Sequence, residues 1–320
     1  MIKCHLCRAE SSEVVSSHDR HGNPLETRVC NGCGQVFNNP IPDDEELAEF
    51  YALNYRKEYK GSTKPRKRQI MRNFRRMSDI LTQYQDMYMK AENVLDVGAG
   101  SGEFLYAMQL LGKSAEGIEP NQDYAQYCRE HLSINVKTGE ILTANYQQGS
   151  FDFINLSHVL EHLNDPVRYI SILAGWLKHN GTLYIEVPNI FSYAASKSKG
   201  NMFHWGHIFN YSPWTLRAVC GLAGLEECKQ SAERSKDTTG AYFKKTNTSW
   251  TQEMAANPEN ANNVKQAIAA HQAGRSRQGK LKRLLRKHQA QVSDTINGYR
   301  HNDPKDIGTA ILTKFVNSDL

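Results

Sequence analysis

The chain has 320 residues, of which 39% are hydrophobic, and a formal net charge of +5. A chain of this length can bury a sizeable core and form one large domain with appendages. The sequence contains no apolar run that approaches the roughly 18 residues of a membrane span. The first residues, MIKCHLC, do not have the pattern of a signal peptide. We therefore expect a cytoplasmic protein without a transmembrane segment.

Four of the seven cysteines form two C-x-x-C pairs near the N-terminus, Cys4 with Cys7 and Cys30 with Cys33. In a reducing compartment such pairs indicate a metal site rather than disulfides. Each pair can place two thiolates about 2.3 Å from one Zn²⁺, and four thiolates complete a tetrahedron without an open position. We expect residues 1–40 to be a zinc-binding module that needs this structural metal to fold.

Basic residues are concentrated in two runs. Seven Lys or Arg residues lie between Lys64 and Arg76, and seven more lie between Arg275 and Lys287. Such runs favour an anionic partner, which could be a phosphate, a nucleic acid or a membrane surface. The alternative is that each run is simply the solvated face of a helix.

The expected organisation of the chain follows from these patterns. Residues 41–90 have a helical pattern and are interpreted as linker and substrate-side helices. Residues 91–250 are expected to form the core, and residues 251–300 a basic helical insertion that includes a helix at 275–288. The β-rich run AILTKFV predicts that residues 301–320 supply a terminal strand that completes the core.

Within the core, short β-rich runs alternate with helical stretches. VLDVG, SAEGIEP, FDFINLS and TLYIEVPN are the predicted strands. Strands that alternate with helices of about 10–15 residues indicate βαβ units and an α/β fold whose parallel sheet is covered on both faces. Right-handed crossovers then bring the carboxyl ends of the strands to one edge, where ligands bind.

A glycine-rich loop follows the first of these strands. Gly98, Gly100 and Gly102 let the backbone turn sharply and approach a ligand, and the next helix directs its first amides there. Their spacing differs from the G-x-G-x-x-G that seats a pyrophosphate. Asp96 could accept hydrogen bonds from an ammonium group, which favours a zwitterionic or cationic ligand. Glu119 ends the next strand and is placed to bind both hydroxyls of a ribose.

The blocks LDVGAGSGEF, GIEP, FDFINLSHVLEHLNDP and GTLYIEVPN together resemble the class I S-adenosylmethionine-dependent methyltransferases. They are most similar to the group that contains ubiquinone-pathway O-methyltransferases and methyltransferases of sugar and natural-product pathways. The resemblance covers about residues 91–225. It implies a Rossmann-like sheet of seven strands, the last of them antiparallel, and in-line transfer of a methyl group from a sulfonium to a nucleophile.

The same resemblance implies positions for the cofactor. The loop from Asp96 to Gly102 would hold the methionine part of S-adenosylmethionine, Glu119 its ribose, and residues 139–141 would flank the adenine. The expected cofactor-binding residues are Asp96, Gly98, Ala99, Gly100, Gly102, Glu119, Pro120, Glu140, Asn155, Ser157 and His158.

A cluster of histidines follows the predicted strand FDFINLS. His158, Glu161 and His162 resemble the E-x-x-E-H set with which ubiquinone and small-RNA methyltransferases bind a divalent ion, except that His158 replaces the first Glu. Three interpretations stay open: Glu161 and His162 only pack the loop, they form a second metal site, or His158 is a general base. His204 and His207 resemble a histidine motif of sugar C-methyltransferases. These two are also candidate catalytic residues, unless they only pack a lid.

The acceptor is less defined than the donor. A four-cysteine module before this fold resembles the sugar C-methyltransferases, which favours a small or carrier-linked acceptor such as a nucleotide sugar, a polysaccharide or a natural-product precursor. The basic runs would suit a phosphorylated acceptor or a peripheral contact with a membrane. The alternatives are an rRNA or tRNA methyltransferase that uses the zinc module and the basic helices, and a non-catalytic cofactor-binding scaffold.

Overall fold

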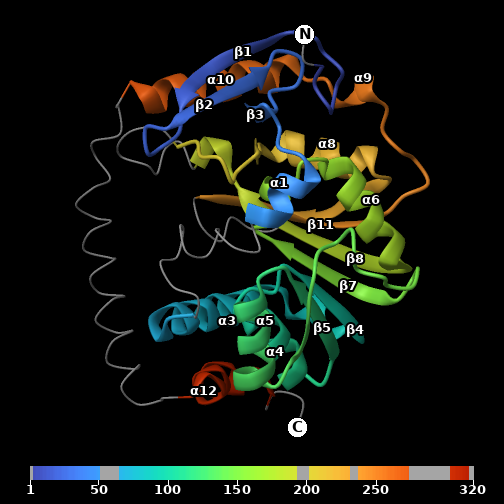
Figure 1. The fold of residues 1–320 in the computed structure, drawn as a ribbon. Helices are drawn as coiled ribbons and strands as arrows, with labels where there is room; N and C mark the ends of the chain where they lie inside the picture. Colours follow the sequence, from blue (N-terminus) through green and yellow to red (C-terminus); the bar gives the residue numbers. More distant parts are fainter. Residues whose placement is uncertain (1–2, 51–64, 193–201, 231–236, 274–302, 317–320) are drawn as a thin grey trace. The chain divides into compact units, whose positions relative to one another are not determined.

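The computed structural model describes residues 3–50, 65–192, 202–230, 237–273 and 303–316 (Figure 1). The chain divides into two compact units: residues 1–44 with 156–280, and residues 45–155 with 281–320. Among the described residues, no helix has the length and apolar character to cross a membrane.

Seven strands form a mixed α/β sheet in the order β10-β11-β8-β7-β4-β5-β6 (Figure 1). Their bounds are β4 (Asn93–Val97), β5 (Ser114–Glu119), β6 (Asn135–Thr138), β7 (Phe151–Ser157), β8 (Leu177–Pro188), β10 (Leu225–Gln230) and β11 (Thr238–Lys245). The pairs β4–β5, β4–β7 and β5–β6 are parallel, whereas β11 is antiparallel to both β8 and β10. The predicted Rossmann-like sheet with an antiparallel last strand is thus confirmed.

The unit that contains residues 45–155 packs its helices around β4, β5 and β6. These helices are α3 (Lys67–Met89), α4 (Glu103–Leu110), α5 (Gln122–Tyr127), the π-helix Cys128–Leu132 and α12 (Pro304–Val316), and α1 (Asp44–Glu49) begins at the unit boundary. The apolar stripe of α3 faces α4 and α12. Phe74 of α3 meets Tyr106 of α4 edge-on, with ring centroids 5.7 Å apart. The N-terminal half of α3 therefore has basic residues on one face and buried apolar residues on the opposite face.

The sequence predicts a terminal strand in residues 301–320, and this prediction is wrong because helix α12 occupies Pro304–Val316. Asp303 precedes the helix, and its Oδ1 accepts a hydrogen bond of 2.7 Å from the amide of Lys305. An acidic residue followed by proline is a typical helix start. The buried side chains of this helix recur at helical spacing: Ile307, Leu312 and Phe315. The antiparallel last strand of the sheet is β11 instead.

The N-terminal residues form a second sheet, in the order β1-β2-β3-β9. Its strands are β1 (Ser12–His18), β2 (Pro24–Cys30), β3 (Val36–Asn39) and β9 (Phe209–Asn210). Because β9 belongs to a distant part of the sequence, the module expected in residues 1–40 does not form its sheet alone. Its sheet is continuous with the segment around residue 209.

The remaining helices of this unit are the 3-10 turn Leu160–His162, α6 (Pro166–Trp176), α8 (Pro213–Leu222), α9 (Gln252–Ala255) and α10 (Pro258–Gln272). Helix α10 lies against β2 (Figure 1). Its Val264 and Ile268 join a buried cluster with Val29 and Val36 of the N-terminal sheet. The first part of the insertion expected in residues 251–300 therefore packs against the N-terminal sheet. The basic helix predicted at 275–288 lies outside the described residues.

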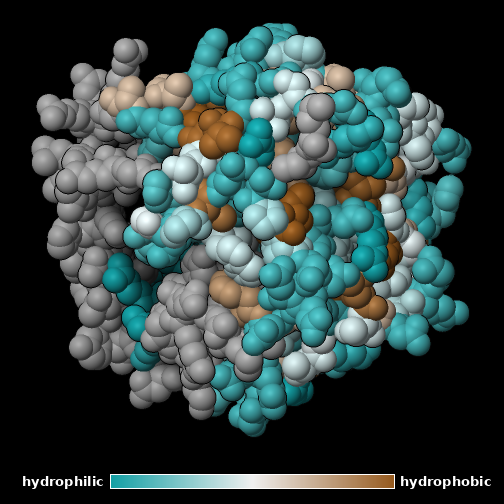
Figure 2. All heavy atoms as spheres, turned by 45° about the horizontal axis from the view of Figure 1, so that its top comes forward, coloured by the Kyte–Doolittle hydropathy of each residue, from teal (hydrophilic) through white to brown (hydrophobic). Residues whose placement is uncertain are grey.

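The face drawn in Figure 2 is mainly hydrophilic, and its hydrophobic residues form small separate patches. Across the described residues, the large hydrophobic side chains that are exposed are Val14, Ile41 and Met254. Single exposed hydrophobic side chains are normal on a protein surface. The polar features of the molecule are thus the informative ones for function.

Candidate functional site

The glycine-rich loop leads from β4 into α4. Gly98, Gly100 and Gly102 all have positive φ angles, of 74°, 56° and 81°. A Cβ atom at Gly102 would lie 2.5 Å from Ile134 Cδ1 and 2.9 Å from Cys128 Sγ. Backbone conformation and packing therefore both require glycine there. The loop delivers the chain to the N-terminus of α4, where free amides favour a polar ligand.

Asp96 lies near the end of β4 and is buried, with 3% of its surface exposed. Its Oδ1 accepts a hydrogen bond of 2.6 Å from Asn155 Nδ2. Burial raises the pKa of Asp96 to about 7; the hydrogen bond from Asn155 opposes this rise, and the charges of Glu119 and Glu103 add to it. A cation bound beside Asp96 would favour its ionised form. The residue is thus suited to receive an ammonium group.

Glu119 ends β5 next to the same loop. Its Oε2 accepts a hydrogen bond of 2.8 Å from the amide of Gly100, and its Oε1 accepts one of 3.1 Å from the amide of Asn121. The amide of Gly139 donates to the carbonyl of Glu119 at 3.1 Å, so the turn that contains Glu140 begins beside Glu119. A carboxylate fixed in this way has further lone pairs for the hydroxyls of a ribose.

The structure gathers nine of the expected cofactor residues at the carboxyl ends of β4, β5, β6 and β7: Asp96, Gly98, Ala99, Gly100, Gly102, Glu119, Pro120, Glu140 and Asn155. Ser157 is the last residue of β7 and His158 follows it, and both belong to the other unit.

His158 lies between two buried glutamates. Its Nδ1 is 3.4 Å from Glu161 Oε1 and its Nε2 is 3.3 Å from Glu186 Oε1, and both glutamate side chains are 1% exposed. The His158 side chain is 37% exposed, so its ring is accessible from solvent. Its φ of 58° is unusual for a residue with a side chain, and its amide donates to the carbonyl of Glu186 at 2.8 Å. Strain of this kind gathers at functional sites.

Glu161 is ionised despite its burial. Burial alone would raise the pKa of this carboxyl, but the neighbouring His162 and the hydrogen bond from His158 hold it below its ordinary value. Its Oε2 has no hydrogen-bond partner among the described residues. The carboxylate therefore has capacity for a further cationic or donor group.

The side chains of His162, His204 and His207 pack against one another. The rings of His204 and His207 lie 3.9 Å apart, and those of His162 and His207 lie 4.8 Å apart. Burial and the charge of Arg20 lower the pKa of His204 to about 2, and burial with the neighbouring His204 lowers the pKa of His207 well below its ordinary value. Both rings are thus neutral near pH 7. Neutral imidazoles are competent metal ligands.

One tautomer of His162 is fixed by its environment. Its Nδ1 contacts the carbonyl oxygen of Gly206, which only accepts hydrogen bonds, so Nδ1 carries the proton. In the neutral ring the lone pair is on Nε2, which lies 3.8 Å from Glu161 Oε1. Ligand atoms of Glu161, His162 and His207 all lie within 4.8 Å of one another. A backbone carbonyl that orients an imidazole in this way is typical of metal-binding histidines.

Asn38 of the N-terminal sheet holds the histidine loop in place. Its Nδ2 contacts three carbonyl oxygens, those of His204 at 3.2 Å, Trp205 at 3.3 Å and His207 at 3.1 Å. Its Oδ1 accepts a hydrogen bond of 3.1 Å from Thr27 Oγ1. The side chain is 1% exposed. The loop that carries two of the candidate catalytic histidines is therefore anchored by the cysteine-containing module.

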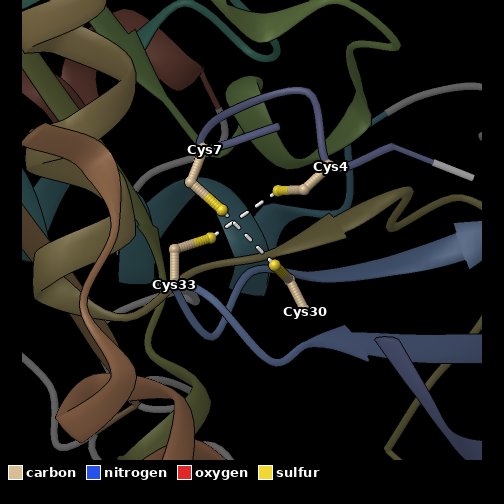
Figure 3. Close-up of side chains that lie close together, drawn as sticks. All are labelled: Cys4, Cys7, Cys30 and Cys33. Atoms are coloured by element: carbon tan, nitrogen blue, oxygen red, sulfur yellow. Dashed lines mark hydrogen bonds between the residues drawn. The ribbon is translucent and has the colours of Figure 1, made fainter. Parts of the chain in front are cut away.

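The four N-terminal cysteines converge, as Figure 3 shows. The sulfur atoms of Cys4 and Cys33 are 3.6 Å apart, and those of Cys7 and Cys30 are 3.5 Å apart. Four thiolates at about 2.3 Å from one Zn²⁺ in tetrahedral geometry stand roughly 3.8 Å from each other, so these separations fit. Hydrogen bonds from Cys33 and Cys4 lower the pKa of Cys30 strongly, whereas the hydrogen bond with Cys30 raises that of Cys33. Without a cation the cluster therefore stabilises only part of its thiolates.

Two residues of this site were not identified in the sequence, Glu186 and Asn38. Glu186 is an acid inside the otherwise apolar strand GTLYIEVPN, and a buried acid of that kind is a recognisable signal. Asn38 had no such signal, because its partners are carbonyl groups some 170 residues later in the chain.

Comparison with known proteins shows which family the chain is similar to. A family described as "Methyltransferase domain" matches residues 64–230, just over half of the chain. An enzyme named "Ubiquinone biosynthesis O-methyltransferase" from Coxiella burnetii is 30% identical over 174 residues, which are 50% of this chain and 70% of the relative. The enzyme of the same name from Xanthomonas campestris is 35% identical over 103 residues, which are 30% of this chain and 43% of the relative.

Solved structures with a similar fold include a magnesium protoporphyrin IX methyltransferase from Synechocystis with bound S-adenosylhomocysteine. It is 13% identical, has a TM-score of 0.48, and is covered over its full length by 64% of this chain. The cofactor loop, the sheet order and the family match agree with one another. The chain belongs to the class I S-adenosylmethionine-dependent methyltransferases.

Proposed function

We propose that this methyltransferase acts on a small or carrier-linked acceptor, such as a nucleotide sugar, a polysaccharide or a natural-product precursor, and that His158 is its general base. The observation that carries this proposal is the position of His158, a partly exposed imidazole between Glu161 and Glu186. An imidazole is a competent base near neutral pH for a hydroxyl or a carbon acid.

S-adenosylmethionine, when bound, supplies the electrophilic methyl group. We assign its binding to Asp96, the glycine loop, Glu119 and the turn at Glu140, which are supported by the contacts described above. These residues mainly align the donor, and alignment is a large part of what a methyl transfer needs.

Both ring nitrogens of His158 face carboxylates, Nδ1 toward Glu161 Oε1 at 3.4 Å and Nε2 toward Glu186 Oε1 at 3.3 Å. In the neutral ring one nitrogen donates to its carboxylate and the other keeps a lone pair. That lone pair takes the proton of the acceptor as the acceptor atom bonds to the methyl group. The resulting imidazolium lies between two carboxylates, Glu161 and Glu186, which stabilise its charge.

A second arrangement is favoured by Oε2 of Glu161 and Nδ1 of His207, which have no hydrogen-bond partner among the described residues. Glu161, His162 and His207 would together hold a divalent ion such as Zn²⁺, Mn²⁺ or Fe²⁺, to which imidazole and carboxylate ligands are suited. The ion would supply Lewis acidity toward an acceptor hydroxyl. We also propose that Cys4, Cys7, Cys30 and Cys33 hold a structural Zn²⁺.

Methyl transfer from tritiated S-adenosylmethionine to cell extracts tests the acceptor class. Incorporation into material that survives nuclease treatment supports a small or carrier-linked acceptor, whereas loss of all incorporation after nuclease identifies an RNA acceptor. His158→Ala should reduce incorporation by about 10²–10³-fold, since general bases contribute at this level. Normal turnover in His158→Ala, together with loss of turnover when added metal is chelated, would reject His158 as the base and support the metal site at Glu161, His162 and His207.

A further inference from the structure

Asn73 of helix α3 contacts both the glycine-rich loop and the first turn of α4. Its Nδ2 donates to Ser101 Oγ at 3.3 Å and to Glu103 Oε1 at 3.1 Å. Ser101 Oγ donates to the same carboxylate oxygen at 2.6 Å. Ser101 and Glu103 are buried, and all three residues belong to the unit that contains residues 45–155. A hydrogen-bonded network therefore joins α3 to the loop that leads into α4.

The chemistry of this network requires an amide nitrogen on α3. The single hydroxyl proton of Ser101 is donated to Glu103, so the hydroxyl oxygen can only accept from Asn73. The carboxylate of Glu103 accepts hydrogen bonds in the same way. An aspartate in place of Asn73 would have nearly the same shape but two acceptor oxygens, and it would lose both contacts. Shape and hydrogen bonding can therefore be separated at this position.

Packing of α3 fixes the direction in which Asn73 points. Ile70, Phe74 and Met77 are buried and recur at helical spacing on one side of the helix. The ring of Phe74, the residue after Asn73, meets the ring of Tyr106 on α4 edge-on at 5.7 Å. Rotation of α3 about its axis would break these contacts. The core therefore holds the Asn73 amide against the loop.

The loop itself is rich in residues that resist ordering. Ser101 lies between Gly100 and Gly102, which both have positive φ angles. Glycine has more backbone freedom to lose than any other residue, so a loop of this composition is costly to order. Glu119 holds one side of the loop, because its Oε2 accepts from the amide of Gly100 at 2.8 Å. The network at Ser101 supplies a second attachment, and a loop that is ordered beforehand leaves less of this cost to ligand binding.

We propose that Asn73 is a positioning residue for the methyl donor, which acts through Ser101 and Glu103 by holding the glycine-rich loop in its binding conformation. Glu103 also belongs to the surroundings of the residue assigned to the ammonium group: burial raises the pKa of Asp96 to about 7, and the charge of Glu103 adds to this rise. The inference rests on the assignment of S-adenosylmethionine to this loop in the proposed function. It adds to that site a residue of α3, a helix that the cofactor motifs of the sequence do not include.

Calorimetry with S-adenosylmethionine and amide hydrogen exchange test this on the full chain, at a temperature where thermal denaturation shows every variant to be folded. We expect Asn73→Ala and Asn73→Asp each to weaken binding by about tenfold, the effect of losing a hydrogen bond to a charged group. Without cofactor, the amides of residues 98–102 should exchange about tenfold faster in both variants. Gln83→Glu makes the same chemical change at an exposed position of α3 and is the matched control, which should keep both properties.

Asn73→Asp decides between hydrogen bonding and mere packing. Affinity equal to that of the wild-type protein in this variant, or an equal loss in Gln83→Glu, would overturn the inference. The exchange experiment contains no cofactor, so it keeps this inference distinguishable from the proposed function. Faster exchange in the variants without binding of S-adenosylmethionine to the wild-type protein would reject the cofactor site, whereas normal binding with unchanged exchange would reject the role of Asn73.

Discussion

At the scale of single residues, the burial of Asp96 makes the proposed binding of an ammonium group there depend on pH. Its pKa in the folded protein is about 7, compared with an ordinary value of 3.8. Between these two pH values the folded chain holds a proton that the unfolded chain has released, so the contribution of Asp96 to stability falls as the pH rises. A bound ammonium group would reverse this preference because it favours the carboxylate.

We therefore expect the affinity for S-adenosylmethionine to weaken below pH 7, by up to about tenfold per pH unit. Calorimetry at pH 6 and pH 8, in buffers of different ionisation enthalpy, would measure both the affinity and the proton released on binding. Asp96→Asn should remove the pH dependence. Equal affinity and no proton release in the wild-type protein at both pH values would contradict the assignment of Asp96 to the ammonium group.

Glu186 gives a second prediction at this scale. Glu186→Gln keeps the shape of the side chain but removes a charge that stabilises the His158 imidazolium. We expect kcat to fall by roughly 10- to 100-fold, less than for loss of the base itself, with little change in KM. Glu227→Gln, which alters a paired acid on β10, is the control. A change in KM alone would assign Glu186 to substrate binding instead.

At the scale of elements, β3 is connected to the histidine loop through Asn38. Asn38→Ala leaves three carbonyl groups without their shared donor, and a buried unsatisfied group costs about 1–3 kcal/mol. We expect the melting temperature and kcat to fall together, and the histidine ring signals in NMR spectra to shift. Asn39→Ala removes a side chain that donates to Glu26 Oε1 and should leave those signals in place. Identical spectra of the two variants would show that Asn38 does not position the loop.

Helix α12 gives an independent prediction about packing. A Cβ atom at Gly308 would lie 2.6 Å from Phe74 Cζ and 2.7 Å from Tyr106 Cε1, both of which are ring atoms in a packed interface. Gly308→Ala should therefore destabilise the unit by about 1–3 kcal/mol, as overpacking does in other cores. Chemical denaturation measures this. Gly112→Ala, at a position with open space but a φ of 73°, separates the cost of packing from that of backbone strain.

At the scale of the whole molecule, the two units contain different proposed sites. The proposed zinc site and the histidine cluster lie in the unit formed by residues 1–44 and 156–280, whereas Asp96 and Glu119 lie in the other. Cys33→Ser should therefore lose zinc, measured by elemental analysis, and most of its turnover, because β9 pairs with β3. Binding of S-adenosylmethionine should change by less than about threefold.

The control for this experiment is Cys228→Ser, which alters an exposed cysteine outside the cluster and should keep both zinc and turnover. Full turnover of the zinc-free Cys33→Ser protein would show that the histidine loop does not need the metal-bound module. Loss of cofactor binding in the same variant would show that the two units depend on each other for folding.

The amino-acid sequence by itself determined the donor half of this protein. The alternation of strands and helices, the spacing of the three glycines, and the acids Asp96 and Glu119 are local signals, because each strand, loop and helix start lies within a few residues of the next. The two C-x-x-C pairs are a local signal of the same kind. For that reason a parallel α/β sheet and the cysteine cluster could be predicted without coordinates, whereas the cofactor and the antiparallel last strand were implied by the family resemblance.

Only the tertiary structure decided the rest. The run AILTKFV has strong β propensity, yet Asp303 and Pro304 start a helix there and packing against α3 and α4 keeps it helical. Propensity is a weak prior that tertiary contacts override. Glu186 and Asn38 reach the histidines only through the tertiary fold, which brings β8 and β3 to them. Such long-range pairings have no local signal, so the surroundings of the histidines become visible only in the folded chain.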